Sequence, residues 1–86
     1  MSDEVERIVS AALRLKGGAV ITVPQPKRHA DAIREAIEMG EDMDGHEQGF
    51  VTSAGHFVDR YRAARLAWYA GQVPDLPRGL TSEDLW

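Results

Sequence analysis

The chain has 86 residues, of which 43% are hydrophobic and 28% charged, and it carries a net charge of −4 and no cysteine. This length suits one small domain, and the composition is too apolar for a disordered chain. Without cysteine, disulfides, thiolate zinc sites and cysteine nucleophiles are all excluded.

The ten Lys and Arg residues lie in short clusters along the chain. A nucleic acid polymer needs a broad basic surface that displaces its counterions, so the clusters favour a small anionic ligand. The acidic start, MSDEVERIVS, lacks the basic and apolar segments of a signal peptide, and no apolar run reaches membrane-spanning length. We therefore expect one domain over residues 1–86, in a cytoplasmic protein with no membrane partner.

The first segment, residues 5–15, fits two structures. Its apolar residues follow the i, i+3, i+4 spacing of a helix that Gly17 would cap, yet alternate residues from Val9 to Leu15 also share one face of a strand. Periodicity slightly favours the helix. The following KGG and the β-branched run AVITV are instead typical of a hairpin, so the pattern alone leaves both open.

The next element is a helix that follows the words PQP. Pro24 ends the preceding strand because proline cannot donate to a ladder, and Pro26 suits a first helical position. The helix is predicted to run from Pro26 to Met39 and to end at Gly40. It is predicted to bury three residues on one face: Ala30, Ile33 and Ile37.

The words GFVTSAGHFVD predict a second hairpin, with strands at residues 50–52 and 56–58. Asp59 is expected to cap a second helix over residues 60–70, with Gly71 just past its end. The small-residue face of this helix suits close packing on a sheet: Ala63, Leu66, Ala67 and Ala70.

The remaining QVPDLPRGLTSEDLW predicts an extended arm, whose apolar end docks on its own core or on a neighbouring subunit. The fold class expected from these elements is α+β. We predict a small antiparallel sheet made of two hairpins, two helices, and an extended C-terminal arm in a single domain.

Positive side chains open both predicted helices: Lys27, Arg28 and His29 in the first, and Arg60 and Arg62 in the second. Cations are unfavourable there by a few tenths to about 1 kcal/mol, because the helix dipole is positive at that end. A bound phosphate would reverse this cost, since free amides, the dipole and a guanidinium all attract it. The alternative is pairing with acidic side chains nearby in the sequence.

Aromatic and hydroxyl side chains surround the second predicted hairpin turn. Phe50 and Phe57 could stack on a base beside an arginine, or they could belong to the core of so small a chain. Thr52 and Ser53 could bind a phosphate or ribose, or bond the local backbone as turn hydroxyls often do. Both readings stay open for each residue.

The three histidines, His29, His46 and His56, lie in different predicted elements and lack metal-ligand spacing. The acidic loop EDMDGHE lacks the first and last ligands of an EF-hand. No serine elbow or carboxylate pair supplies a nucleophile for a histidine base. We expect no metal, no cofactor and no catalytic residue.

Several words of the sequence, in this order, resemble a large group of small phage-encoded proteins: AALRL before a Gly turn, VPQPKRH, QGFVTSAGHFVDR, AARLAWYAGQ and LTSEDLW. The words span most of the chain and leave out the first few residues and the 40–46 loop. By this resemblance the group includes the anti-Thoeris sponge proteins, by which phages sequester the cyclic ADP-ribose isomers used as bacterial immune signals. The resemblance implies an α+β fold, a strand for the first segment, homo-oligomers (dimers or higher), and tight nucleotide binding without turnover.

The resemblance also implies a set of ligand-binding residues: Arg14, Arg28, His29, Phe50, Thr52, Ser53 and Arg60. This chain departs from the group's pattern at three positions. Ala30 stands where a second histidine is common, His56 where an arginine is common, and Arg62 where a glutamate is common. These changes move positive charge and leave the identity of the ligand open.

The hypothesis from the sequence is a phage counter-defence protein that sequesters a cyclic-nucleotide-type signal. Arg14, Arg28 and Arg60 are expected to meet phosphates, and Phe50 or an aromatic near it to stack on adenine. One rival is an anti-CRISPR-like inhibitor that binds a protein and mimics nucleic acid with its acidic loop. The other rival is a small nucleotide hydrolase.

Overall fold

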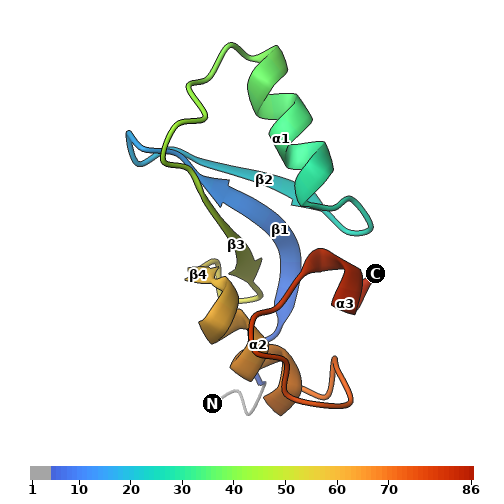
Figure 1. Ribbon diagram of the computed structural model, residues 1–86. Coiled ribbons are helices and arrows are strands. Elements are labelled where there is room, and N and C mark those ends of the chain that lie inside the picture. Colours follow the sequence, from blue (N-terminus) through green and yellow to red (C-terminus); the bar gives the residue numbers. More distant parts are fainter. Residues whose placement is uncertain (1–4) are drawn as a thin grey trace.

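The computed structural model describes residues 5–86 (Figure 1). Four strands form one antiparallel sheet in the order β2-β1-β3-β4. The elements in chain order are β1 (Ile8–Arg14), β2 (Val20–Pro24), α1 (His29–Glu38), β3 (Glu47–Thr52), β4 (Phe57–Asp59), α2 (Arg60–Tyr69) and α3 (Ser82–Leu85). The predicted α+β class, with its two hairpins, is confirmed.

The first segment is a strand, so the helix reading of residues 5–15 is wrong. Gly18, with φ 97°, turns the chain back, and β2 pairs along β1 from Ser10 opposite Pro24 to Arg14 opposite Val20. On its other edge β1 pairs with β3. A central strand has both edges hydrogen-bonded and both faces partly covered, so its apolar residues follow one another without clean alternation. That is why periodicity misled.

Helix α1 begins at His29 rather than at Pro26. Pro26 lies in the turn before the helix, where the main-chain N of Lys27 donates to Pro24 O at 2.9 Å. Arg28 is the N-cap, and its main-chain N donates to the carboxylate of Asp31 at 2.8 Å.

The predicted buried face of α1 is also wrong in part. The buried residues are His29, Ala32 and Ala36, with Ile33 half-buried, whereas Ala30 is exposed and Ile37 is 61% exposed. The anchoring of His29 decides the face, because hydrogen bonds from its ring hold it inside the molecule. Two alanines one turn apart then let the helix approach the sheet closely.

The second hairpin and its helix follow the prediction closely. Phe50 pairs with Val58 across β3 and β4, and Asp59 Oδ1 accepts a hydrogen bond from the main-chain N of Arg62 at 2.7 Å, as a helix cap does. The buried residues of α2 are all small: Ala63, Ala64 and Ala67. Leu66 and Ala70, which were predicted on this face, are half-buried.

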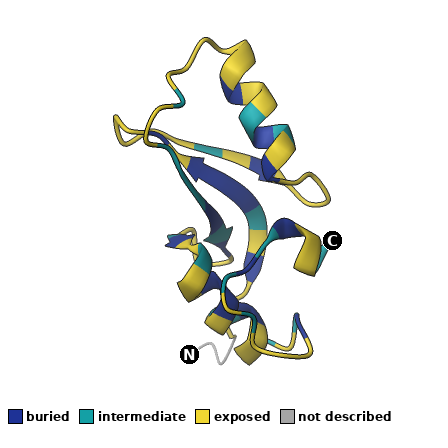
Figure 2. Cartoon of the chain, viewed as in Figure 1, coloured by how far each residue is buried: buried dark blue, intermediate teal, exposed yellow. Residues whose placement is uncertain are grey.

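One core cluster joins the sheet to both long helices. Figure 1 shows α1 beside β1 and β2, and α2 beside β3 and β4. Figure 2 shows the buried residues running along β1 and recurring in α1 and α2. The larger side chains of this cluster come from the strands and from the C-terminal segment: Ile8, Leu13, Val23, Phe50, Val58, Val73 and Leu80. The fold is therefore a sheet with two helices packed through alanines on a shared core.

The C-terminal arm is only partly extended, because its end forms the four-residue helix α3. The carboxylate of Asp84 accepts hydrogen bonds from the main-chain N and the hydroxyl of Thr81, at 2.9 and 3.0 Å. These contacts close the turn that the arm prediction missed. Leu85 and Trp86 pack against the core of the same chain, which is one of the two predicted alternatives, and Trp86 Nε1 donates to Lys27 O at 2.8 Å.

Candidate functional site

The seven ligand-binding residues implied by the sequence do not line one cavity. Of these seven, Ser53 alone lines any of five cavities on the described surface. The remaining six lie in the core, in the strands of the sheet, or against the C-terminal segment. Each location has its own physical cause.

His29 and Phe50 belong to the core. His29 Nε2 donates to Gly49 O at 2.7 Å, so Nδ1, which lies 3.2 Å from Ser82 Oγ, is left to accept. Burial lowers the pKa of His29, and the nearby Arg60 lowers it further, against the effect of the Gly49 carbonyl. The ring meets Phe50 edge to face at 4.8 Å, and Phe50 is 0% exposed. Phe50 therefore offers no ring face to a base.

Thr52 and Ser53 use their hydroxyls to hold the β3–β4 turn. Thr52 Oγ1 donates to the carboxylate of Glu6 and accepts from the main-chain N of Ala54 and of His56, at 3.2 and 3.3 Å. Ser53 Oγ accepts from the main-chain N of Arg7 at 3.1 Å. The bonds of Thr52 to Ala54 and His56 are the local backbone bonds that the sequence left open as the alternative to ligand binding, whereas Glu6 and Arg7 are remote in the chain.

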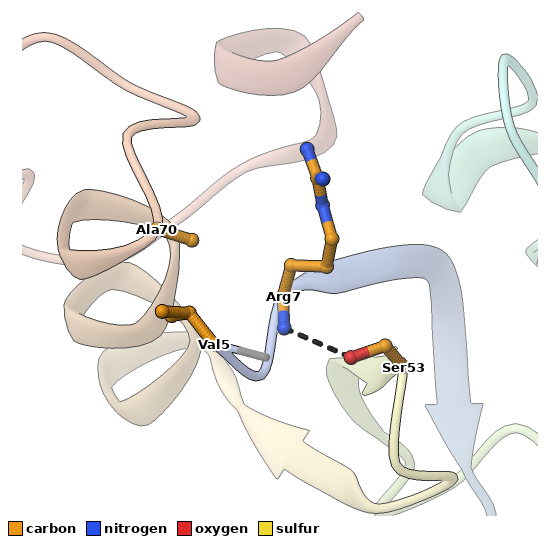
Figure 3. Close-up of a pocket in the computed structure, with 4 residues that line it drawn as sticks. All are labelled: Val5, Arg7, Ser53 and Ala70. Carbon is orange, nitrogen blue, oxygen red and sulfur yellow. Dashed lines mark hydrogen bonds between the residues drawn. The ribbon is translucent and has the colours of Figure 1, made fainter. Parts of the chain in front are cut away.

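One cavity lies beside Ser53, with a volume of about 400 Å³ and a lining of Val5, Arg7, Ser53 and Ala70 (Figure 3). The figure shows the guanidinium of Arg7 pointing away from the hydroxyl of Ser53, while Val5 and Ala70 form an apolar side. One guanidinium, with the hydroxyl already accepting from the backbone, makes this a poorer phosphate site than a pair of guanidinium groups would be.

Arg14 is committed to the sheet. It forms an ion pair with Glu47, its pairing partner on β3, and its guanidinium carbon lies 5.0 Å from the centroid of the Phe57 ring. By strand alternation Arg14 points to the side of β1 opposite the core residue Leu13. This cation therefore has a structural partner within the sheet.

Arg28 and Arg60 bind the C-terminal segment. Arg28 Nε donates to Trp86 O at 2.6 Å, and Arg60 Nε donates to Leu80 O at 3.0 Å. Main-chain oxygens within residues 80–86 therefore accept hydrogen bonds from both guanidinium groups. Neither arginine forms an ion pair with a carboxylate in residues 5–86.

A different cationic site lies on the outer side of α2. A cavity of about 360 Å³, here called the basic hollow, is lined by Tyr61, Arg65, Leu76, Pro77 and Arg78. Tyr61 and Arg65 lie one turn apart on the helix, so they are neighbours on its surface. The lining contains two guanidinium groups, an exposed aromatic ring and no carboxylate.

Hydrogen bonds between α2 and the segment after it build the basic hollow. The main-chain N of Leu80 donates to Arg60 O at 2.9 Å, and Arg60 Nε returns a bond to Leu80 O. The loop carrying Leu76 to Arg78 is thereby held beside the first turn of α2. A Cβ built on Gly79 would lie 3.6 Å from Arg60 Nη2 and 3.7 Å from Tyr61 Cε1. Arg60 is therefore the one residue of the predicted set that lies beside this hollow.

Two further observations concern residues 5–86. They contain no group of three or more His, Asp or Glu side chains that could hold a metal ion. No helix within them combines the length and apolarity that crossing a bilayer requires.

A family model described as the phage T4 y16D protein matches residues 7–86. The chain therefore belongs to this phage protein family. No curated protein matches the chain, and no solved structure matches it.

Proposed function

We propose that this member of the phage T4 y16D protein family binds a small anionic nucleotide of the cyclic-nucleotide signal class and holds it without turnover. The observation that carries the proposal is the basic hollow, in which Arg65 and Arg78 flank the exposed ring of Tyr61 with no carboxylate in the lining. In a phage protein, retention of a host immune signal would act as counter-defence.

The chemistry of the hollow suits a nucleotide. Each guanidinium can bind a phosphate through two parallel hydrogen bonds, and no ion pair to a described carboxylate competes for Arg65 or Arg78. The Tyr61 side chain belongs to a residue that is 62% exposed, so its ring can stack on a base. Leu76 and Pro77 add an apolar wall.

The energy required is within reach of these groups. Sub-micromolar binding needs a net gain of about 8 kcal/mol. A stacked base contributes roughly 1 to 3 kcal/mol, and each hydrogen bond to a charged group about 1.5 to 3 kcal/mol. Two phosphate contacts and one stacked base therefore approach the affinity that sequestration requires.

The resemblance to the anti-Thoeris sponge proteins supports the same class of ligand. The cations implied by that resemblance do not all lie at the hollow. Arg14 and Arg28 contact other parts of the chain, while Arg60 borders the hollow. Tyr61 is the aromatic residue that would stack on adenine, the role predicted from the sequence for Phe50 or an aromatic near it.

The test uses the purified chain and adenine-containing cyclic nucleotides. After incubation and removal of free ligand, the protein is denatured by heat and the released compound is analysed. Recovery of intact nucleotide supports the proposal, an altered product indicates a hydrolase, and the absence of uptake contradicts nucleotide binding.

The site within the chain is tested by Arg65→Gln and Arg78→Gln. Each should weaken binding at least tenfold, because each removes one phosphate contact. Arg34→Gln is the matched control, since Arg34 is an exposed arginine on α1 that lies 3.6 Å from Asp31. Unchanged affinity in the Arg65 and Arg78 variants together would rule out the basic hollow.

A second candidate function is inhibition of a protein partner. Five exposed acids lie on α1 and in the loop after it: Glu35, Glu38, Glu41, Asp42 and Asp44. Such a surface could imitate nucleic acid toward a basic protein. This candidate predicts that the protein takes up no nucleotide. It also predicts that inhibition of the partner is lost when Glu41 and Asp42 are both replaced by their amides.

A further inference from the structure

A second cavity lies at the β3–β4 hairpin, away from the lining of the basic hollow. Its volume is about 510 Å³, and its lining consists of Glu6, Gly55, His56, Phe57, Val58 and Arg62. It combines a carboxylate, an imidazole, a guanidinium and an apolar wall. The chemistry of this mixed lining limits what it can bind.

Glu6 has one oxygen engaged and one available. Its Oε2 accepts from Thr52 Oγ1 and lies 3.0 Å from His56 Nδ1. Oε1 makes no hydrogen bond to any residue in the part of the chain that the structure describes. The hydrogen bond from Thr52, helped by His56 and Arg62, lowers the pKa of Glu6 although partial desolvation opposes it. The carboxylate is therefore ionised at neutral pH and accepts only.

His56 and Arg62 each present nitrogen atoms that remain available. Because a carboxylate donates nothing, the proton between Glu6 and His56 is on Nδ1 of the imidazole. Nε2 of His56 makes no hydrogen bond within residues 5–86, and the side chain is 69% exposed. Arg62 uses its main-chain N for the Asp59 cap, and its guanidinium forms no ion pair with a described carboxylate.

Phe57 and Val58 form the apolar wall, and Phe57 is held firmly. A Cβ on Gly49 would lie 2.5 Å from Phe57 Cζ, which shows how closely the ring lies against the main chain of β3. The guanidinium of Arg14 lies over the same ring. A rigid wall of this kind suits a ligand with an apolar face.

The mixed charge excludes simple ions as good ligands. A bare anion would bind Arg62 but would be repelled by the negative charge of Glu6. A bare cation would be repelled by the positive charge of Arg62. A ligand that carries its anionic group at one end and hydroxyl donors at the other satisfies both. A guanidinium favours phosphate, and a carboxylate oxygen with free lone pairs accepts from ribose hydroxyls.

We propose that this cavity binds a sugar phosphate, with Arg62 at the phosphate, Glu6 and Nε2 of His56 accepting from the sugar hydroxyls, and Phe57 against the carbon face of the sugar. It goes beyond the nucleotide binding proposed for the basic hollow, because it uses none of the same side chains. Loss of one site leaves the other intact.

The experiment titrates the full chain with ribose 5-phosphate, with ribose and with inorganic phosphate, by isothermal titration calorimetry. Ribose 5-phosphate should bind at least tenfold more tightly than phosphate or ribose. Arg62→Gln should weaken the binding of ribose 5-phosphate at least tenfold. The Glu6→Gln variant should bind ribose 5-phosphate no more tightly than it binds inorganic phosphate. Arg65→Gln, in the basic hollow, is the matched control and should leave this affinity unchanged.

Three results would overturn the proposal. Equal affinity for phosphate and ribose 5-phosphate would show that the sugar is not recognised. A loss caused by Arg65→Gln, with none caused by Arg62→Gln, would place the ligand in the basic hollow. The absence of any binding would exclude the site altogether. Because Arg62 is exposed and Arg62→Gln keeps the helix cap, this variant tests the site even if Glu6→Gln fails to fold.

Discussion

The hairpin region around Phe50 and the outer surface of α2 use polar and aromatic side chains in opposite ways. At the hairpin, His29, Thr52 and Phe50 have their donors, acceptors or ring faces engaged inside the chain. On α2, Tyr61 and Arg65 are exposed and line a cavity. The comparison teaches that side chains whose bonds are complete build the scaffold, whereas those with unused bonds are available to a ligand.

The largest effect should come from Gly49→Ala. A Cβ there would lie 2.3 Å from Val58 O, whose main chain is fixed by the β3–β4 ladder, and 2.5 Å from Cζ of Phe57. Unfolding free energy should fall by about 3 kcal/mol or more. Urea denaturation measures the change, and Gly17→Ala is the control because no atom lies within 4 Å of its added Cβ. Equal stability of the two variants would contradict the close approach.

His29→Ala should lower the unfolding free energy by about 2 to 3 kcal/mol. The change leaves Gly49 O without its buried donor and opens a space beside Phe50. Thermal unfolding followed by circular dichroism measures it. A loss below 0.5 kcal/mol would mean that His29 is available to a ligand after all.

The same side chain makes stability depend on pH. Since burial lowers the pKa of native His29 below its ordinary 6.5, the unfolded chain binds more protons between the two values. Its contribution to stability is complete above pH 6.5 and is lost as the pH falls toward the native pKa. The urea midpoint of the wild type should be lower at pH 5.0 than at pH 7.5, and His29→Gln should reduce this difference. His46→Gln should keep it, and an equal reduction in both variants would contradict the assignment.

Asp59→Ala should cost about 1 kcal/mol, because it removes the acceptor for the main-chain N of Arg62 at the start of α2. Chemical denaturation measures the loss. Asp59→Asn, which keeps a capping oxygen, should retain most of the stability. If both variants lose the same amount, charge rather than capping is the cause.

The smallest effect on stability should come from Arg65→Gln, because Arg65 lies on the exposed outer surface of α2. With no ion pair to a described carboxylate, its removal should change unfolding free energy by less than about 0.5 kcal/mol. The same variant should weaken nucleotide binding at least tenfold. A large loss of stability would show that Arg65 belongs to the scaffold.

Local signals predicted much of the fold. The Gly-rich turn, the β-branched run before Pro24, the cap at Asp59 and the alanines of α2 each depend on neighbours in sequence, and each appears as expected. The buried face of α1 was missed because it depends on His29 reaching Gly49 and Ser82, which are remote in the chain.

The candidate site was harder to predict for the same reason. Tyr61 and Arg65 share a helix face, and this signal was present in the sequence. Arg78 joins them only because Leu80 and Arg60 exchange hydrogen bonds. Nothing in the sequence indicated that the C-terminal segment would also accept a hydrogen bond from the guanidinium of Arg28.

By itself the sequence determined the second hairpin, the strand before Pro24, the approximate extent of the two long helices and the supply of cations, because propensity, capping and turn chemistry act over a few residues. Only the tertiary structure decided which cations remain available. A guanidinium binds whichever acceptor the fold brings within reach, and residues 80–86 brought main-chain oxygens to Arg28 and Arg60 while Arg65 and Arg78 were left facing a cavity.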